Sequence, residues 1–236
     1  MSNLSPQSNG MALDLHVHTA IGSSDCHLSL ALLAEAAHQV GIHGFAVAEH
    51  DTSWAPERLS SYRQESGLFV CAGREWPTNW GHVIALGLDH KLEDVRRLDE
   101  LRRLADEAGG YLILAHPFRF FPSASNYLFG PHDNSSTLTP EEMARHPAWE
   151  LVDEIEVLNY NCTDKENELA AEVARVLGMR GTAGSDAHTF TEVGRCVTVM
   201  ERSVASEREL IEELRAGRHH LARRRPNGEY VHLTAG

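Results

Sequence analysis

The feature that most constrains the fold is a regular alternation of two kinds of segment along the chain. Short, nearly continuous apolar runs, typical of strands covered on both faces, alternate with segments whose apolar residues recur at helical spacing and that end at a glycine. The expected strands are 12–18, 44–50, 68–73, 82–88, 111–116, 154–160, 179–186 and 196–200. The expected helices are 29–41, 92–110, 163–178 and 206–217. This alternation predicts an α/β fold, and a single barrel domain suits a chain of 236 residues.

Two segments fall outside this rhythm. Residues 1–11 contain no basic residue and no apolar core, so they do not resemble a secretory signal, and we expect a flexible leader before a single domain at 12–236. Residues 120–149 are rich in Ser, Asn, Pro and aromatic residues, and we expect a lid-like insertion there. Its aromatic side chains could stack on a base or pack the lid against the domain: Phe120, Phe121, Tyr127 and Phe129.

The composition disfavours several classes of protein. The formal net charge of -13 argues against a nucleic-acid polymer as partner, because an acidic chain repels the phosphate backbone. No apolar run approaches the ~20 residues that span a membrane. The four cysteines are scattered and form no CxxC pair, which argues against a disulfide framework or a structural zinc knuckle and favours a reducing cytoplasm.

Histidines and carboxylates gather where the expected strands end. His16 and His18 lie two positions apart and would share one face of a strand, and Asp186 and His188 repeat this spacing on a late strand. Further strand ends carry His50, Asp51, Glu75 and His116, whereas His82 stands at the beginning of its run. Barrel enzymes place their chemistry at the carboxyl ends of strands, and closure of a barrel makes the first and late strands neighbours. One such histidine is usually a surface or core residue, but the whole set predicts a metal centre.

The types of ligand indicate the kind of metal. Imidazole together with carboxylate favours zinc, manganese or iron over calcium or magnesium alone. The candidate ligands are too many for one ion of about four to six positions. Two or three ions that share Glu75 as a bridge would use them all.

Eight motifs occur along the chain in the order DLHVHT, SSDC, AEHD, GREW, WGHVIALGL, AHPF, EIEVLN and GSDAH. They cover roughly residues 12–200 and resemble the PHP family, the polymerase and histidinol phosphatase superfamily. The resemblance implies a distorted (β/α)7 TIM-like barrel with two or three divalent metal ions. The first ion would be held by His16, His18, Glu75 and Asp186, the second by Glu75, His82 and His116, and the third by Asp25, His50 and His188.

The resemblance also implies a function. We expect a metal-dependent phosphoesterase in which a metal-bound hydroxide attacks the phosphorus of a small phosphorylated metabolite or nucleotide. Arg119 is the candidate to neutralise the phosphoryl charge, and His132 is the candidate general acid. Asp51 and Asp14 are candidates to orient ligand imidazoles.

Two other functions fit the same residues. An amidohydrolase-like enzyme would use a similar barrel and metal centre to cleave a C–N or carboxyl ester bond. A regulatory domain would bind metal without catalysis, although the intact ligand motifs count against that function.

Overall fold

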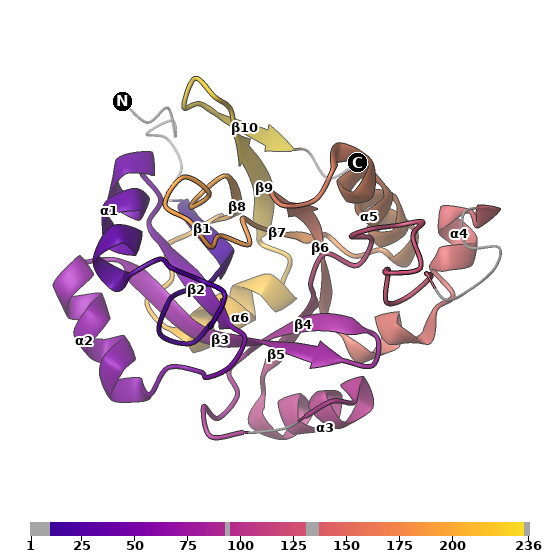
Figure 1. Ribbon diagram of the computed structural model, residues 1–236, viewed down its shortest axis with the longest axis horizontal. Helices are drawn as coiled ribbons and strands as arrows, with labels where there is room; N and C mark the ends of the chain where they lie inside the picture. The colour runs from indigo at the N-terminus through magenta and orange to yellow at the C-terminus, as the bar shows by residue number, and fades with distance from the viewer. Residues whose placement is uncertain (1–9, 93–94, 131–136, 234–236) are drawn as a thin grey trace.

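In the computed structural model, which describes residues 10–92, 95–130 and 137–233, ten strands form one strongly curled sheet (Figure 1). Their order in the sheet is β10-β9-β8-β1-β2-β3-β4-β5-β6-β7. The strands are β1 (Met11–Val17), β2 (Gly44–Glu49), β3 (Phe69–Thr78), β4 (Gly81–Leu86), β5 (Tyr111–Leu114), β6 (Glu154–Asn159), β7 (Thr182–Gly184), β8 (Cys196–Met200), β9 (His219–Arg224) and β10 (Tyr230–Leu233).

The curl of the sheet brings the segment after β7 against the end of β1. The Ala187 amide donates to the His16 carbonyl (3.2 Å), and the His18 amide donates to the Ala187 carbonyl (2.9 Å). The first half of β1 pairs instead with β8, which runs antiparallel to it. The first and late strands are therefore neighbours, and the predicted distorted TIM-like barrel is confirmed.

A tight turn between β3 and β4 interrupts the parallel strands. β3 ends at Thr78 and β4 begins at Gly81, and the Thr78 hydroxyl donates to the Gly81 carbonyl (2.7 Å). So short a connection can join only antiparallel strands, and β4 runs against both β3 and β5. The beginning of β4 consequently lies at the same edge of the sheet as the carboxyl ends of its neighbours.

Helices lie between the strands and cover the sheet. They are α1 (Leu30–Val40), α2 (Pro56–Ser66), α3 (Leu98–Ala108), α4 (Pro140–Met143), α5 (Asp164–Leu177), α6 (Glu207–Arg215) and the 3-10 helix η2 (Pro147–Leu151). Ser29 caps the start of α1, and Thr163 with Glu166 forms a capping box at the start of α5. The helices predicted at 29–41, 163–178 and 206–217 are confirmed.

Other elements differ from the prediction. The helix expected at 92–110 begins only at Leu98, whose amide donates to the Asn79 side chain from the β3–β4 turn (2.9 Å). Periodicity along the chain cannot reveal a cap from so distant a residue. Helix α2 was not expected because it buries only Tyr62 and lacks an apolar stripe. Strands β9 and β10 extend the sheet beyond the expected set.

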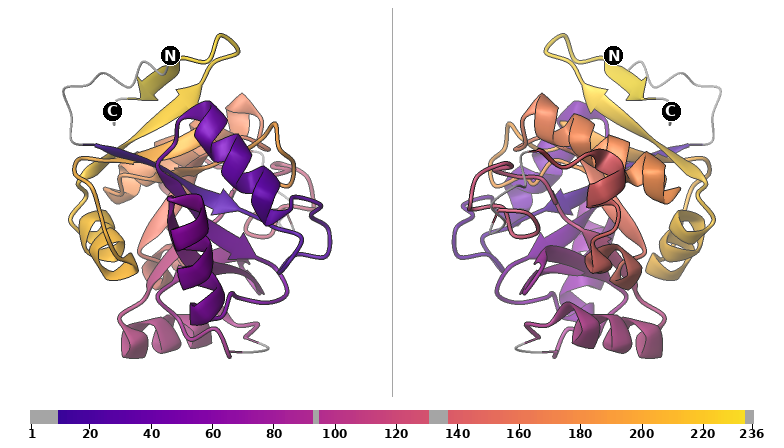
Figure 2. Two further views of the ribbon diagram at one scale, coloured as in Figure 1. Left: turned by 90° about the vertical axis from the view of Figure 1, so that its left-hand side faces the viewer. Right: turned by 90° about the vertical axis from the view of Figure 1, so that its right-hand side faces the viewer.

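The helices pack in layers. α1 and α2 pack on Val47 and neighbouring outward residues of β2, and α3 and α5 pack on the core that contains Leu112 of β5. α6 covers the end of the curled sheet where the amino ends of β1 and β5 lie (Figure 2). Its Leu210 packs there with Met11 and Tyr111. The carboxyl ends of the strands are left open for a site.

The segment from Phe118 to Gly130 is anchored by aromatic packing. The buried rings of Phe118 and Phe129 stack with centroids 5.5 Å apart, and Trp149 packs against Phe118. Phe121 also packs against this cluster, whereas Phe120 and Tyr127 are 58% and 59% exposed. Packing therefore accounts for Phe121 and Phe129 but not for the two exposed rings.

The ends of the expected domain can be placed only in part. Residues 1–9 of the expected leader lie outside the described residues, and Met11 already belongs to β1 and is buried. Within the described ranges, no helix combines the length and the apolar character needed to cross a membrane.

We expect Glu213→Gln in α6 to destabilise the protein at neutral pH but much less in strong acid. Hydrogen bonds from Arg218 and Arg202 lower the pKa of the Glu213 carboxyl to about 2, from an ordinary value of 4.5. Its contribution to the free energy of unfolding is therefore complete above pH 4.5 and is lost as the pH falls towards 2. Urea titrations across this range should show the gap between wild type and variant closing.

The control for this prediction is Glu212→Gln, which changes an exposed neighbour in the same helix. It should show a small effect with no comparable pH trend. A gap for Glu213→Gln that stays constant between pH 6 and pH 2 would contradict the role given to the two arginines.

Candidate metal centre

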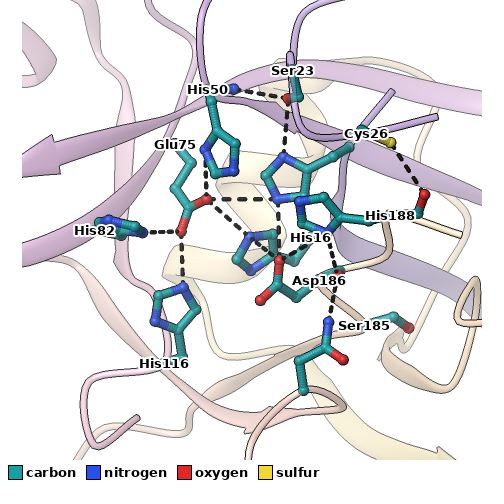
Figure 3. Close-up of polar contacts among 12 residues, drawn as sticks. His16, Ser23, Cys26, His50, Glu75, His82, His116, Ser185, Asp186 and His188 are labelled. Atoms are coloured by element: carbon teal, nitrogen blue, oxygen red, sulfur yellow. Dashed lines mark hydrogen bonds and ion pairs between the residues drawn. The ribbon is translucent and has the colours of Figure 1, made fainter. Parts of the chain in front are cut away.

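The side chains predicted as ligands meet around Glu75, near the end of β3 (Figure 3). The Glu75 carboxylate is 1% exposed and lies among five imidazoles. Oε1 is 3.0 Å from His82 Nδ1 and 2.9 Å from His116 Nε2, and Oε2 is 3.2 Å from His50 Nδ1, 3.5 Å from His16 Nε2 and 3.6 Å from His18 Nε2. A carboxylate in this position can bridge ions on its two sides.

The first predicted ligand set shows the strongest sign of a metal. His16 and His18 are fully buried, and in the described part of the chain their Nε2 atoms have no hydrogen-bond partner. These atoms lie 3.5 Å and 3.2 Å from Asp186 Oδ1. Ligand atoms that each bind one ion at about 2.0–2.2 Å are roughly 3–3.5 Å from one another. Orphaned imidazole nitrogens at these separations from two carboxylates fit a divalent metal ion.

The second set combines Glu75 with His82 and His116, whose ligand atoms lie within 4.8 Å of one another. His82 stands at the beginning of its strand, which set it apart from the other candidates in the sequence. Because β4 runs antiparallel to β3 and β5, its beginning lies beside the carboxyl ends of both strands. His116 follows β5 at that same edge of the sheet. The hairpin therefore supplies two candidate ligands, Glu75 and His82, to one side of the centre.

The third set lies nearer the surface. Asp25 Oδ2 is 3.4 Å from His50 Nε2 and 3.6 Å from His188 Nε2. The ligand atoms of His50 and His188 also group with that of His18. Asp25 is 58% exposed, so this set is open to solvent. The structure thus brings all three predicted sets together, and their binding of metal stays a prediction.

The charges at the centre suit metal ligands. Burial alone would raise the pKa values of Glu75 and Asp186, but charge on His16 holds both well below their usual range. Burial lowers the pKa of His18 to about 4, so this imidazole is neutral at pH 7. The pKa of His16 is raised despite its burial, because Glu156, Asp186 and Glu75 surround it. An ion at this place would displace that proton and release it to solvent.

Two buried carboxylates orient the first two imidazoles. Glu156 Oε1 lies 3.0 Å from His16 Nδ1, so an Nδ1–H directed at Glu156 leaves Nε2 facing the centre. His18 Nδ1 lies 3.2 Å from the Ser23 hydroxyl, which donates to Glu49 Oε2 (2.7 Å). Glu156, Glu49 and Ser23 are not among the site residues predicted from the sequence. An ionisable residue inside an expected buried strand is the signal that could have identified the two glutamates.

Three predicted residues need separate comment. Asp14 accepts from the backbone amides of His16, Ser185 and Gly194, so it ties β1 to the segment after β7 and does not orient an imidazole as predicted. Asp51 accepts from the Ser24 amide (2.9 Å) and holds the loop that carries Asp25, and its predicted role beside a ligand imidazole stays a prediction. His132 lies outside the described residues.

Two candidate ligands adopt backbone conformations that are uncommon for residues other than glycine. His116 has φ 31° and Asp186 has φ 52°. The His116 amide donates to Glu156 Oε2 (3.0 Å), and the Asp186 carbonyl accepts from the Asn161 side chain (2.7 Å). Strained positive-φ residues concentrate at functional sites, and here hydrogen bonds to both backbones stabilise them.

Arg119 provides positive charge at the edge of the centre. Its Nη2 donates to Asp186 Oδ2 and to Asn159 Oδ1, the latter at 3.2 Å. Asp186 therefore directs one oxygen towards the imidazoles and the other towards a guanidinium. The Arg119 side chain is 22% exposed, so it is accessible from the open end of the barrel.

Two depressions open beside the candidate ligands. One of about 410 Å³ is lined by residues that include His50, Glu75 and His82, and another of about 120 Å³ is lined by residues that include His82 and His116. A larger groove of about 680 Å³ lies between α5 and the β9–β10 hairpin, and none of the candidate ligands lines it. Of these three hollows, the two smaller ones are relevant for a substrate, because candidate ligands line them.

Comparisons with known proteins bear on the family. A family model described as PHP-associated matches residues 164–219, which run from the start of α5 to the start of β9. No curated protein matches the chain.

Solved structures share the fold at low sequence identity. A protein of Bifidobacterium adolescentis, provisionally described as a metal-dependent phosphoesterase, aligns with a TM-score of 0.57 and 16% identity over 75% of this chain and 87% of its own. An amidohydrolase of Chromobacterium violaceum with bound sulfate aligns with a TM-score of 0.60 and 15% identity over 85% and 96%. The lesion-specific endonuclease Q of Pyrococcus furiosus aligns with a TM-score of 0.58 and 14% identity over 88% of this chain but 56% of its own.

We expect Glu156→Gln to weaken metal binding about 10- to 100-fold, because the variant removes the negative charge that fixes the His16 ring. The measurement is the dissociation constant for Zn²⁺ in competition with a chromophoric chelator. Glu154→Gln is the matched control, since Glu154 is a buried carboxyl two positions away on β6 that accepts from the backbone amides of Ile155 and Arg180. Equal affinities for the two folded variants would show that Glu156 does not support the ligand.

Proposed function

We propose that this chain, whose residues 164–219 match the PHP-associated family model, is a metal-dependent phosphoesterase of the PHP superfamily that cleaves phosphate esters of small molecules. The observation that carries the proposal is the shared Glu75 carboxylate, which places three groups of metal-competent side chains around one point. Adjacent ion sites that share a carboxylate are typical of enzymes that displace groups at phosphorus.

Bound divalent ions would supply a water molecule of lowered pKa and would neutralise charge on the phosphoryl oxygens. The side chains of the chain perform the remaining tasks. Glu156, Glu49 and Ser23 keep the His16 and His18 imidazoles in the orientation that directs Nε2 to the centre. Their hydrogen bonds preorganise the site, so little reorganisation is needed when substrate binds.

Arg119 is the residue placed to bind the phosphoryl group. Asp186 and Asn159 hold its Nη2 atom, and its buried Nε atom has no hydrogen-bond partner among the described residues. A guanidinium fork matches the geometry of phosphate oxygens, and its charge strengthens each hydrogen bond. We assign Arg119 the task of orienting the substrate and stabilising the charge that develops during transfer.

The acidic chain favours a small substrate over a nucleic-acid polymer. The resemblance of the fold to an amidohydrolase keeps C–N or carboxyl ester hydrolysis as the alternative chemistry. A panel of phosphomonoesters, phosphodiesters, carboxyl esters and amides separates these activities. Turnover of amides alone would overturn the proposal, and metal binding without any turnover would support a regulatory domain instead.

We expect His16→Ala and Asp186→Ala each to lower both the bound metal and the rate of phosphate ester hydrolysis, the rate by about 100-fold or more. Each variant removes a ligand atom from the first predicted set. The measurements are metal per chain by elemental analysis and initial rates on the preferred phosphate ester. Asp89→Ala removes an exposed carboxylate far from the centre and serves as control. Full metal content and activity in both variants would show that the ligand set is wrong.

We expect Arg119→Ala to lower kcat about 100- to 1,000-fold, since it removes a charged donor aimed at the phosphoryl group. Arg195→Ala is the matched control, because Arg195 donates to the Thr191 carbonyl (2.8 Å) and lies over the Tyr160 ring. Metal content should be measured in parallel, since Arg119 also contacts Asp186. A normal kcat in an Arg119→Ala protein with its metal intact would contradict this role.

A further inference from the structure

We propose that Phe120, Tyr127 and Trp80 form a subsite for an aromatic ring in the alcohol part of the substrate. The inference rests on the proposed function, because it assigns the group that the phosphate ester would carry. It concerns the depression of about 120 Å³ beside the candidate ligands, whose lining includes Trp80, His82, His116, Arg119, Phe120 and Tyr127.

Hydrogen bonds of a buried side chain support the loop that carries the two most exposed rings, Phe120 and Tyr127. The buried Asn126 side chain donates to the carbonyls of Pro117 (2.8 Å) and Arg119 (3.0 Å), and its Oδ1 accepts from the Phe129 amide (2.8 Å). These hydrogen bonds join the residues just before Phe120 to the residues on either side of Tyr127. The subsite is therefore formed before a ligand arrives, which reduces the entropic cost of binding.

The rings of Phe120 and Tyr127 are far more exposed than their neighbours in the loop. Phe120 is 58% and Tyr127 is 59% exposed, although their neighbours Phe118, Leu128 and Phe129 are buried. Phe120 also has φ 66°, an outlier for a bulky residue, and its amide is fixed by the Glu166 carboxylate of α5. A strained backbone that presents an apolar ring to solvent is better explained by a ligand than by stability.

The size of the depression limits what it can hold. An apolar cavity of about 150 Å³ is known to bind benzene, so a volume of about 120 Å³ with an open mouth suits one ring. Aromatic walls favour a planar aromatic ligand, through offset or edge-to-face contacts. A polyol or a long flexible chain would leave these walls unmatched.

The position of the depression relates it to the reaction. The Tyr127 ring lies 5.6 Å from the His82 ring between centroids, and His82 and His116 both contact Glu75. Arg119 lines the same depression and also reaches Asp186. A phosphate at the centre could therefore carry a ring in the subsite through a short linker.

The experiment compares two esters whose leaving groups are both primary alcohols, benzyl phosphate and glycerol 1-phosphate. For the metal-loaded protein we expect kcat/KM to be at least 10-fold higher for benzyl phosphate. Tyr127→Ala should reduce this ratio about 10-fold, and Tyr127→Phe should retain it. Tyr160→Ala is the matched control, because Tyr160 is 43% exposed but does not line the depression, and it should leave the ratio unchanged.

A binding measurement separates this inference from the proposed function. By calorimetry, benzylphosphonate should bind at least 10-fold more tightly than methylphosphonate, and Tyr127→Ala should abolish the difference. Hydrolysis of both esters without preference, and equal phosphonate affinities, would overturn the subsite and leave the phosphoesterase intact. Selective phosphonate binding without hydrolysis of any phosphate ester in the panel would overturn the phosphoesterase and support the subsite. A Tyr127→Ala effect of equal size on both ligands would also overturn the subsite, since it would indicate a general loss of structure.

Discussion

The structure depends above all on the buried charge of Glu75. An ionised carboxylate removed from water costs several kcal/mol unless partners compensate it, and here five imidazoles surround it. Those imidazoles come from segments that are far apart in the sequence. Only a sheet curled enough to bring the ends of β1, β2, β4 and β5 to one point can supply them. The curl of the sheet is therefore what brings these imidazoles to Glu75.

The β3–β4 hairpin serves the centre in more than one way. Glu75 and His82 stand on its two strands and face each other at 3.0 Å. In its turn, Asn79 binds the first amide of α3 (2.9 Å) and so fixes the helix that covers β5. A regular barrel would place a helix between these strands and would move His82 to the closed end. The antiparallel strand β4 thus interrupts the regular barrel and places the candidate ligand His82 at the centre.

Sequence reasoning succeeded where the signal was local or repeated. Apolar runs and glycine stops predicted most strands and three of the helices, and the strand-end histidines predicted which side chains converge. It failed where a distant residue decides, as in the start of α3, which depends on Asn79. It also did not find the contacts of Asp14, because a position two residues before His16 does not reveal that the backbone amides of Ser185 and Gly194 donate to its carboxylate. The role of Glu156 depends on a contact 140 positions away in the chain.

The seam between β1 and the segment after β7 has a consequence for folding. Only a few backbone hydrogen bonds join Val17 and its neighbours to Ala187, yet the first ligand set takes residues from both sides of that seam. An ion shared by His16 and Asp186 would cross-link the two ends of the barrel and close a loop that contains most of the chain. Closing such a loop removes more chain entropy from the unfolded state than closing a short one, although the dependence on length is weak. Chelation would then open the seam first, before the helices on the outside of the sheet lose their packing.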